Sequence, residues 1–169
     1  MRYVMKQKIL TLTDQFTIKD DNGEDVYQVK GKLISIGDKL TLRNMQGDEL
    51  AVIKQEIISL VPSYRIYRDG DLQADVSKKL LTVLKDKFKV DMKDGSKDLQ
   101  IIGNILDHEY RVKRGKDEVA HVSKKWISIR DSYGIEVDEG EDDVLILACA
   151  VIVDMISHDP KKRAASTSD

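Results

Sequence analysis

Apolar and polar residues alternate along most of this chain in a ten-residue pattern that recurs six times. Each copy reads apolar-apolar-x-apolar-x-(often Asp)-x-apolar-x-apolar, and successive copies start 22 to 24 residues apart. The copies are ILTLTDQFTI from Ile9, LISIGDKLTL from Leu33, IISLVPSYRI from Ile57, LTVLKDKFKV from Leu81, GNILDHEYRV from Gly103 and WISIRDSYGI from Trp126. A period of two is typical of strands that are buried on one face. The fifth copy departs most from the pattern, with Gly103 and Asn104 at two apolar positions.

A glycine-containing turn signal lies between successive copies. The turn segments are DDNGED at 20–25, NMQGDE at 44–49, RDGD at 68–71, KDGSKD at 93–98 and RGKDE at 114–118. Glycine adopts the positive φ that tight hairpins require, so each repeat is predicted to be one β-hairpin. With RYVMKQK at the N-terminus as a leading strand, the chain should form about twelve antiparallel strands. A meander of that length exposes its edges unless it closes, which predicts a closed barrel.

The alternation stops after the last repeat, where EVDEGEDDVLILACAVIVDMISHDP begins acidic and becomes solidly apolar. Acids in a first turn complement the helix dipole, and Pro160 prevents a helix from continuing past Asp159. Frequent β-branched residues leave a strand as the alternative, but about 18 residues is long for one strand. We therefore predict a helix over 141–158, apolar on every side, which must be enclosed.

The expected barrel is wide enough to hold this helix. Twelve strands about 4.8 Å apart and tilted near 40° give a backbone diameter of roughly 24 Å. A helix with its side chains needs about 10 to 12 Å. A bilayer span is disfavoured, because it needs roughly 20 apolar residues and Asp154 interrupts this run.

Composition narrows the classes of function without selecting one. The chain has 169 residues, a net charge of −2 and one cysteine, Cys149, so no disulfide or cysteine metal site is expected within it. The near-neutral charge argues against a duplex nucleic-acid binder, and the N-terminus lacks a signal-peptide pattern, which favours a cytoplasmic location. We expect a single domain over 1–159 and a disordered tail over 160–169.

The pattern also carries a resemblance to a known family. The opening MRYVMKQK, SKKWISIRDSYGIEV at 123–137 and DDVLILACAVIVD at 142–154 resemble the LURP-one-related family of the tubby C-terminal-like superfamily, including its short bacterial members. The resemblance implies a twelve-stranded barrel around a central helix, with no assigned biochemistry. Tubby-like relatives suggest phosphoinositide binding through surface Lys and Arg, and scramblase-type relatives suggest calcium-dependent action at membranes.

Clustered lysines are the candidate binding residues. VSKK occurs at 76–79 and again at 122–125, and three lysines alternate along one predicted strand. A lysine stripe of this kind suits anionic lipid headgroups, although lysines interspersed with acids are also the ordinary solvent face of a sheet. The candidate residues are Lys78, Lys79, Lys85, Lys87, Lys89, Lys124 and Lys125.

No pattern indicates an enzyme. The chain lacks a G-x-S-x-G nucleophile motif and a glycine-rich phosphate loop, and its three histidines fall at a repeat turn, in a strand and at the helix end. We therefore expect a non-enzymatic binding or scaffold domain with no cofactor and no metal, whose partner is unknown. The alternative is a peripheral membrane protein that binds an anionic lipid surface, and a protein partner is also compatible. The acidic loop at 138–143 could hold calcium, but it lacks the spacing of an EF-hand loop, and helix N-terminal charge explains it without a ligand.

Asp154 is the unusual residue of the predicted helix. An unpaired buried carboxylate is costly, so Asp154 should either reach a barrel mouth or pair with a strand Lys, Arg or backbone amide. Cys149 is expected to be a protonated core residue.

Overall fold

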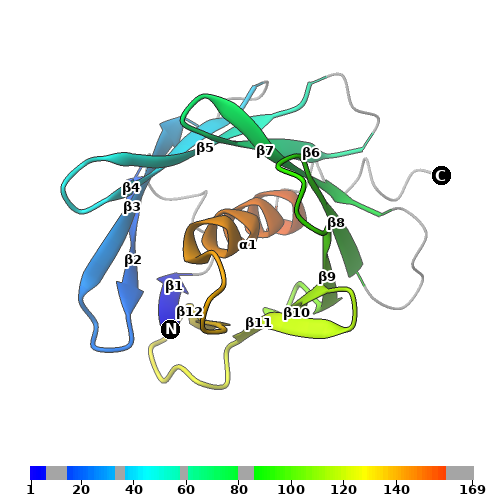
Figure 1. Ribbon diagram of the computed structural model, residues 1–169. Coiled ribbons are helices and arrows are strands. Elements are labelled where there is room, and N and C mark those ends of the chain that lie inside the picture. The colour runs from blue at the N-terminus through cyan, green and yellow to red at the C-terminus, as the bar shows by residue number, and fades with distance from the viewer. Residues whose placement is uncertain (7–14, 33–36, 58–60, 80–85, 159–169) are drawn as a thin grey trace.

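A computed structural model of the chain describes residues 1–6, 15–32, 37–57, 61–79 and 86–158, and the side chain of Lys32 is not described. Twelve antiparallel strands close into a barrel around one helix, α1 (Asp143–His158), as Figure 1 shows. Each strand pairs with its neighbours in sequence, and β12 closes the barrel by pairing with β1. The predicted fold class is therefore confirmed. The strands are β1 (Arg2–Lys6), β2 (Gln15–Asp20), β3 (Asp25–Lys32), β4 (Lys39–Asn44), β5 (Glu49–Gln55), β6 (Ser63–Arg68), β7 (Asp71–Lys78), β8 (Asp86–Met92), β9 (Leu99–Asn104), β10 (Glu109–Arg114), β11 (Asp117–Ser123) and β12 (Ser132–Val137).

The repeat positions correspond to the barrel interior. The eighth and tenth residues of each copy lie on the even-numbered strands, two residues apart, and so point to the same face. All of them are buried except Phe16, which is partly buried and packs against the core. The buried ones are Ile18, Leu40, Leu42, Tyr64, Ile66, Phe88, Val90, Tyr110, Val112, Tyr133 and Ile135.

The helix fills the space that these side chains enclose. Every residue of α1 from Leu145 to Ser157 is buried, as expected for a helix that is apolar on all sides. The helix begins two residues later than predicted, because Asp142 is its N-cap. The Asp142 Oδ1 accepts a hydrogen bond from the Leu145 amide at 3.1 Å, and its carbonyl accepts one from the Ile146 amide.

Acidic residues at the start of α1 fix the helix to three different strands. Asp142 pairs with Arg68 at the end of β6, and Glu141 pairs with Arg114 at the end of β10, where Nη1 lies 2.6 Å from Oε1. The Tyr3 hydroxyl on β1 donates to Asp143. Because these strands lie on separate sides of the barrel, the contacts centre the helix N-terminus.

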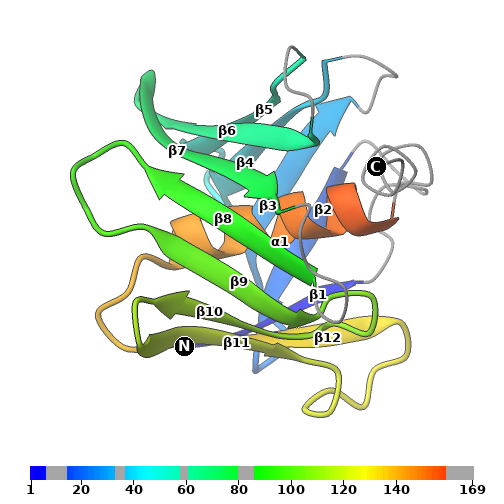
Figure 2. The same ribbon diagram turned by 90° about the vertical axis from the view of Figure 1, so that its right-hand side faces the viewer.

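The two ends of the barrel differ, and Figure 2 shows them on opposite sides of the view. At the hairpin end, short turns join β2 to β3, β4 to β5, β6 to β7, β8 to β9 and β10 to β11, and α1 begins there. At the exit end, α1 terminates beside the β9–β10 turn, and the β11–β12 connection belongs to the same end of the barrel. Residues 7–14, 33–36, 58–60, 80–85 and 159–169 lie outside the described residues, so the predicted tail and Pro160 are not placed.

Gly103 explains why the fifth repeat departs from the pattern. It lies in β9 at φ 152° and pairs with Tyr110 of β10. A Cβ atom at this position would lie 2.5 Å from the Glu109 carbonyl oxygen and 2.6 Å from the Tyr110 Cα. These atoms belong to the backbone of the neighbouring strand, which cannot move aside as a flexible side chain could, so only glycine fits.

We expect Gly103→Ala to lower the free energy of unfolding by about 2 to 4 kcal/mol, because a backbone conflict is added to an unfavourable φ. Gly47→Ala is the matched control, since Gly47 also has a positive φ, 91°, but its Cβ would meet nothing within 4 Å. The control should cost only about 1 kcal/mol. Urea denaturation measures both, and equal losses would show that the close strand contact is unimportant.

Candidate functional site

The last turn of α1 carries a carboxylate and an imidazole on one face. Asp154 and His158 are four residues apart, which places them one above the other along the helix. The His158 Nδ1 lies 3.3 Å from the Asp154 carbonyl oxygen and 3.7 Å from its Oδ1. Only 2% of the Asp154 side chain is exposed, compared with 19% of His158. The two residues therefore form a polar end to an otherwise apolar helix.

A second histidine reaches the same place from the barrel wall. His108 is the last residue of the β9–β10 turn and occupies the sixth position of its repeat, where most other copies have aspartate. Its φ is 50° and its amide donates to the Ile105 carbonyl at 3.1 Å. The His108 ring stacks between Tyr133 of β12, at 4.2 Å, and His158, at 4.9 Å. The turn thus delivers a buried imidazole to the helix end.

Asp154 is partnered on one oxygen only. The Tyr133 hydroxyl donates to Oδ2 at 2.6 Å, while Oδ1 lies 3.4 Å from the His108 Nδ1 without a formed hydrogen bond. Among the described residues, Asp154 Oδ1 and His108 Nδ1 have no hydrogen-bond partner. The buried Tyr110 hydroxyl and Ser157 Oγ also lack one. Unpartnered buried polar atoms are uncommon, so several of them at one helix end make it a candidate ligand-binding site.

Burial controls the protonation of this cluster. It raises the pKa of Asp154 to about 7, against the opposing effects of the Tyr133 hydrogen bond and the positive charge of Lys124. It also lowers the pKa of His108 to about 3, and charges on His158 and Lys124 act in the same direction. The pKa of Tyr133 is raised by burial and by Asp154. The folded state therefore favours an unprotonated His108 ring and resists ionisation of Asp154.

Asp154 differs from the expectation in its partner. It is buried and hydrogen-bonded, but the donor is the phenol of Tyr133 rather than a Lys, an Arg or a backbone amide. Of the three histidines, His108 at the repeat turn and His158 at the helix end come together, whereas His121 lies in β11. The sequence signal for this cluster is a histidine at a repeat position that is usually occupied by aspartate. That signal could not be interpreted without knowing which strands the closed barrel brings to the helix end.

The predicted lysines fall into two groups. Lys87 and Lys89 alternate on β8 with the buried Phe88 and therefore point outward, and Lys79 follows β7 and is exposed. Lys78 pairs with Asp86, with 3.3 Å between Nζ and Oδ1. The other group begins the β11–β12 connection, where Lys124 is half-buried near the Asp154 cluster and Lys125 is exposed. Lys85 lies outside the described residues.

Charge divides unequally between the hairpin end and the rest of the chain. The hairpin turns with their flanking residues, and the segment leading into α1, hold 19 of the 30 acidic residues but only 8 of the 28 basic ones. These segments are 19–25, 43–49, 68–71, 91–98, 113–118 and 136–143. Since the whole chain carries −2, the remainder of the protein has an excess of positive charge.

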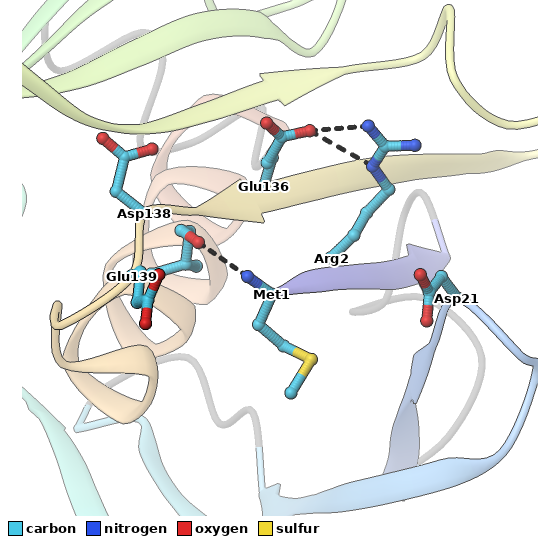
Figure 3. Close-up of a pocket in the computed structure, with 7 residues that line it drawn as sticks. Met1, Arg2, Asp21, Glu136, Asp138 and Glu139 are labelled. Carbon is cyan, nitrogen blue, oxygen red and sulfur yellow. Dashed lines mark hydrogen bonds and ion pairs between the residues drawn. The ribbon is translucent and has the colours of Figure 1, made fainter.

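The acidic loop at 138–143 is largely engaged by protein groups. Glu141, Asp142 and Asp143 each contact a strand residue at the hairpin end. Asp138 and Glu139 line an open surface hollow beside β1, shown in Figure 3, where Arg2 pairs with Glu136 at 2.6 Å. The contacts of residues 141–143 account for half of this loop without calcium.

Comparison with known proteins gives the family. The family model described as LURP-one-related matches residues 1–154. This chain belongs to the LURP-one-related family. It is 32% identical over 152 residues to the uncharacterized protein YxjI of Bacillus subtilis (strain 168), covering 90% of this chain and 91% of that protein. The fold is similar to the X-ray structure of an Arabidopsis thaliana protein, with a TM-score of 0.64, 18% identity and coverage of 94% and 92% of the two chains.

The predicted family is thus confirmed, and the relatives support a domain of this fold whose biochemical role is unassigned. The plant structure shows the fold alone at this identity. The broader likeness to tubby domains stays a prediction. Among the described residues, no helix has the length and apolar character needed to cross a membrane.

The carboxyl of Asp154 should make stability depend on pH. Its folded pKa of about 7 exceeds the usual 3.8, so the folded state binds this proton more tightly than the unfolded state. That stabilisation is fully present below about pH 4 and is lost as the pH rises towards 7. Asp154→Asn keeps an acceptor for Tyr133 but cannot ionise.

We therefore expect the free energy of unfolding of Asp154→Asn, relative to wild type, to rise between pH 4 and pH 7 by on the order of 2 to 4 kcal/mol. The lowered pKa of His108 gives the opposite pH dependence, but wild type and Asp154→Asn share this contribution. Urea denaturation in chelator-containing buffer across this range measures the difference. Asp131→Asn, at an exposed loop position, is the control for exchanging an aspartate for asparagine, and a constant difference for Asp154→Asn would contradict the assigned shift.

Proposed function

We propose that this protein is a non-enzymatic binding domain that docks on anionic lipid headgroups with the exit end of its barrel. The observation that carries this proposal is the division of charge, with acids concentrated at the hairpin end and the excess of basic residues elsewhere. A protein with this charge distribution is oriented by a negative surface before contact, because its acidic hairpin end is repelled and the positively charged remainder is attracted.

Exposed apolar side chains at the exit end support the same docking face. Ile57 after β5, Leu106 in the β9–β10 turn and Ile129 in the β11–β12 connection are 63%, 41% and 58% exposed. Large aliphatic side chains beside lysines suit a membrane interface, since the apolar groups enter the headgroup region while the ammonium groups meet phosphate. Lys79 and Lys125, both exposed, belong to this end.

The interior of the barrel supports a surface role. Helix α1 occupies the space inside the strands, and its residues from Leu145 to Ser157 are buried against them. A ligand would therefore be recognised on the outside of the domain or at a barrel end. A protein-binding scaffold would use the same surfaces, and the experiment that follows distinguishes it by its indifference to headgroup charge.

The triple variant Lys79→Glu/Lys87→Glu/Lys125→Glu should lose binding to phosphatidylglycerol or phosphoinositide vesicles at low salt. Each lysine near an anionic surface contributes about 1 kcal/mol, so the partition coefficient should fall by at least about 100-fold. The control Lys97→Glu/Lys113→Glu/Lys116→Glu makes the same change in net charge at the hairpin end and should retain most of the binding. Vesicle sedimentation measures both.

Three results would count against docking by the exit end. Wild-type protein could fail to sediment with anionic vesicles at low salt. It could bind phosphatidylcholine vesicles equally well, or the two triple variants could lose binding to the same degree.

A further inference from the structure

We propose that His108, Asp154 and His158 bind a divalent transition metal of the Zn²⁺ type at the exit end of α1. One potential ligand atom from each residue lies within 4.8 Å of the other two. Independently, Asp154 Oδ1 and His108 Nδ1 belong to side chains that are only 2% and 1% exposed, and neither has a hydrogen-bond partner among the described residues. This inference concerns a different ligand from the lipid headgroups and stands without them.

The spacing is close to that of a metal site. Zn–N and Zn–O bonds of about 2.0 to 2.2 Å place two tetrahedral ligands roughly 3.3 Å apart. The Asp154 Oδ1 already lies 3.4 Å from the His108 Nδ1 and 3.7 Å from the His158 Nδ1. The stacked rings of the two histidines must turn so that both lone pairs meet the ion. His158 is the more exposed ring and terminates the helix, so it is the one that can move.

The donor types select the metal. Two imidazole nitrogens and one carboxylate oxygen suit Zn²⁺, Co²⁺ or Ni²⁺, whereas Ca²⁺ and Mg²⁺ prefer a shell made entirely of oxygen. Burial keeps His108 unprotonated, so its ring nitrogen is available as a ligand. Three protein donors leave a fourth position for water or another ligand.

The surroundings orient the carboxylate, as hydrogen-bonding groups around metal ligands do. The Tyr133 hydroxyl holds Oδ2 at 2.6 Å, which leaves Oδ1 as the oxygen facing the two histidines. The cluster lies in the last turn of α1, where the helix dipole favours a cation. A bound cation would also compensate the ionised carboxylate, whose burial is otherwise unfavourable.

Lys124 opposes a cation at this position. Its charge acts on both Asp154 and His108, lowering the pKa of each. We therefore expect Lys124→Gln to tighten metal binding severalfold. A merely structural polar cluster would show no such response.

The test uses tag-free, full-length protein that has been stripped with a chelator. Calorimetry with Zn²⁺ should show one ion per chain, and Co²⁺ should give the visible absorption of a tetrahedral complex. A 100-fold excess of Zn²⁺ over its Kd should raise the Tm by about 5 to 10 °C. His158→Gln, at the half-buried helix end, should weaken binding on the order of 100-fold or more while remaining folded by circular dichroism. His121→Gln, which removes the histidine outside the cluster, should bind as wild type does.

Several outcomes would overturn the proposal. Folded wild-type protein could fail to bind Zn²⁺ and Co²⁺ at a metal concentration 100 times a micromolar Kd. Alternatively, His158→Gln could bind both metals as tightly as wild type does. Loss of binding in His121→Gln would assign the ion to His121 and Glu118, which lie 3.7 Å apart on β11. If His158→Gln fails to fold, His108→Gln and Lys124→Gln decide, since the first should abolish binding and the second strengthen it.

Discussion

Enclosure of an apolar helix is the constraint on which the rest of this structure depends. Helix α1 buries every residue from Leu145 to Ser157, so no face of it can be left to water. An open sheet would cover one side of such a helix, whereas a barrel of twelve strands covers all sides and leaves no strand edge exposed. The interior side chains of the even-numbered strands form the matching apolar wall. Barrel and helix therefore require each other, since an empty barrel of this width would have no packed core.

The two ends of the helix meet the barrel in different ways. At the N-terminus, Asp142 caps the helix, and the acids of residues 141–143 contact Arg114, Arg68 and Tyr3, so charge and hydrogen bonding are both satisfied. At the C-terminus, the Asp154 carboxylate receives one hydrogen bond among the described residues, from Tyr133, and keeps an oxygen facing two imidazoles. The first arrangement positions the helix. The second retains a buried carboxylate at an energetic cost, which is the usual condition of a site kept for function rather than stability.

The same difference between the ends underlies both proposals. Acids crowd the hairpin end, where the chain turns most tightly and the helix begins, and lysines with exposed aliphatic side chains are found at the exit end. A domain with this distribution presents one end to an anionic surface, and the polar cluster of Asp154 lies at that end of the helix. Lys124 belongs to both features, because it adds positive charge at the exit end and acts on the buried carboxylate. Metal binding and lipid docking would then influence each other through one side chain.

Most of the fold could be predicted from the amino-acid sequence. Six repeats with glycine turns predict twelve antiparallel strands, and an apolar segment with acids before it predicts the enclosed helix, because period, turn chemistry and capping are local properties of the chain. The family resemblance pointed to the same barrel. The start of α1 was placed two residues early, since a run of acids does not reveal which of them accepts the capping hydrogen bond.

The candidate site could not be predicted in this way, because it depends on how distant parts of the chain pack together. His108 and Asp154 are 46 positions apart and belong to different elements, and they meet because the β9–β10 turn lies where the helix ends. The phenol of Tyr133 became the partner of Asp154 for the same reason, although its position in the repeat predicted only a wall residue. Periodicity specifies which face a side chain takes. Which side chains meet across a barrel depends on strand register and on the depth of the helix, and both are set by the packing of the whole core.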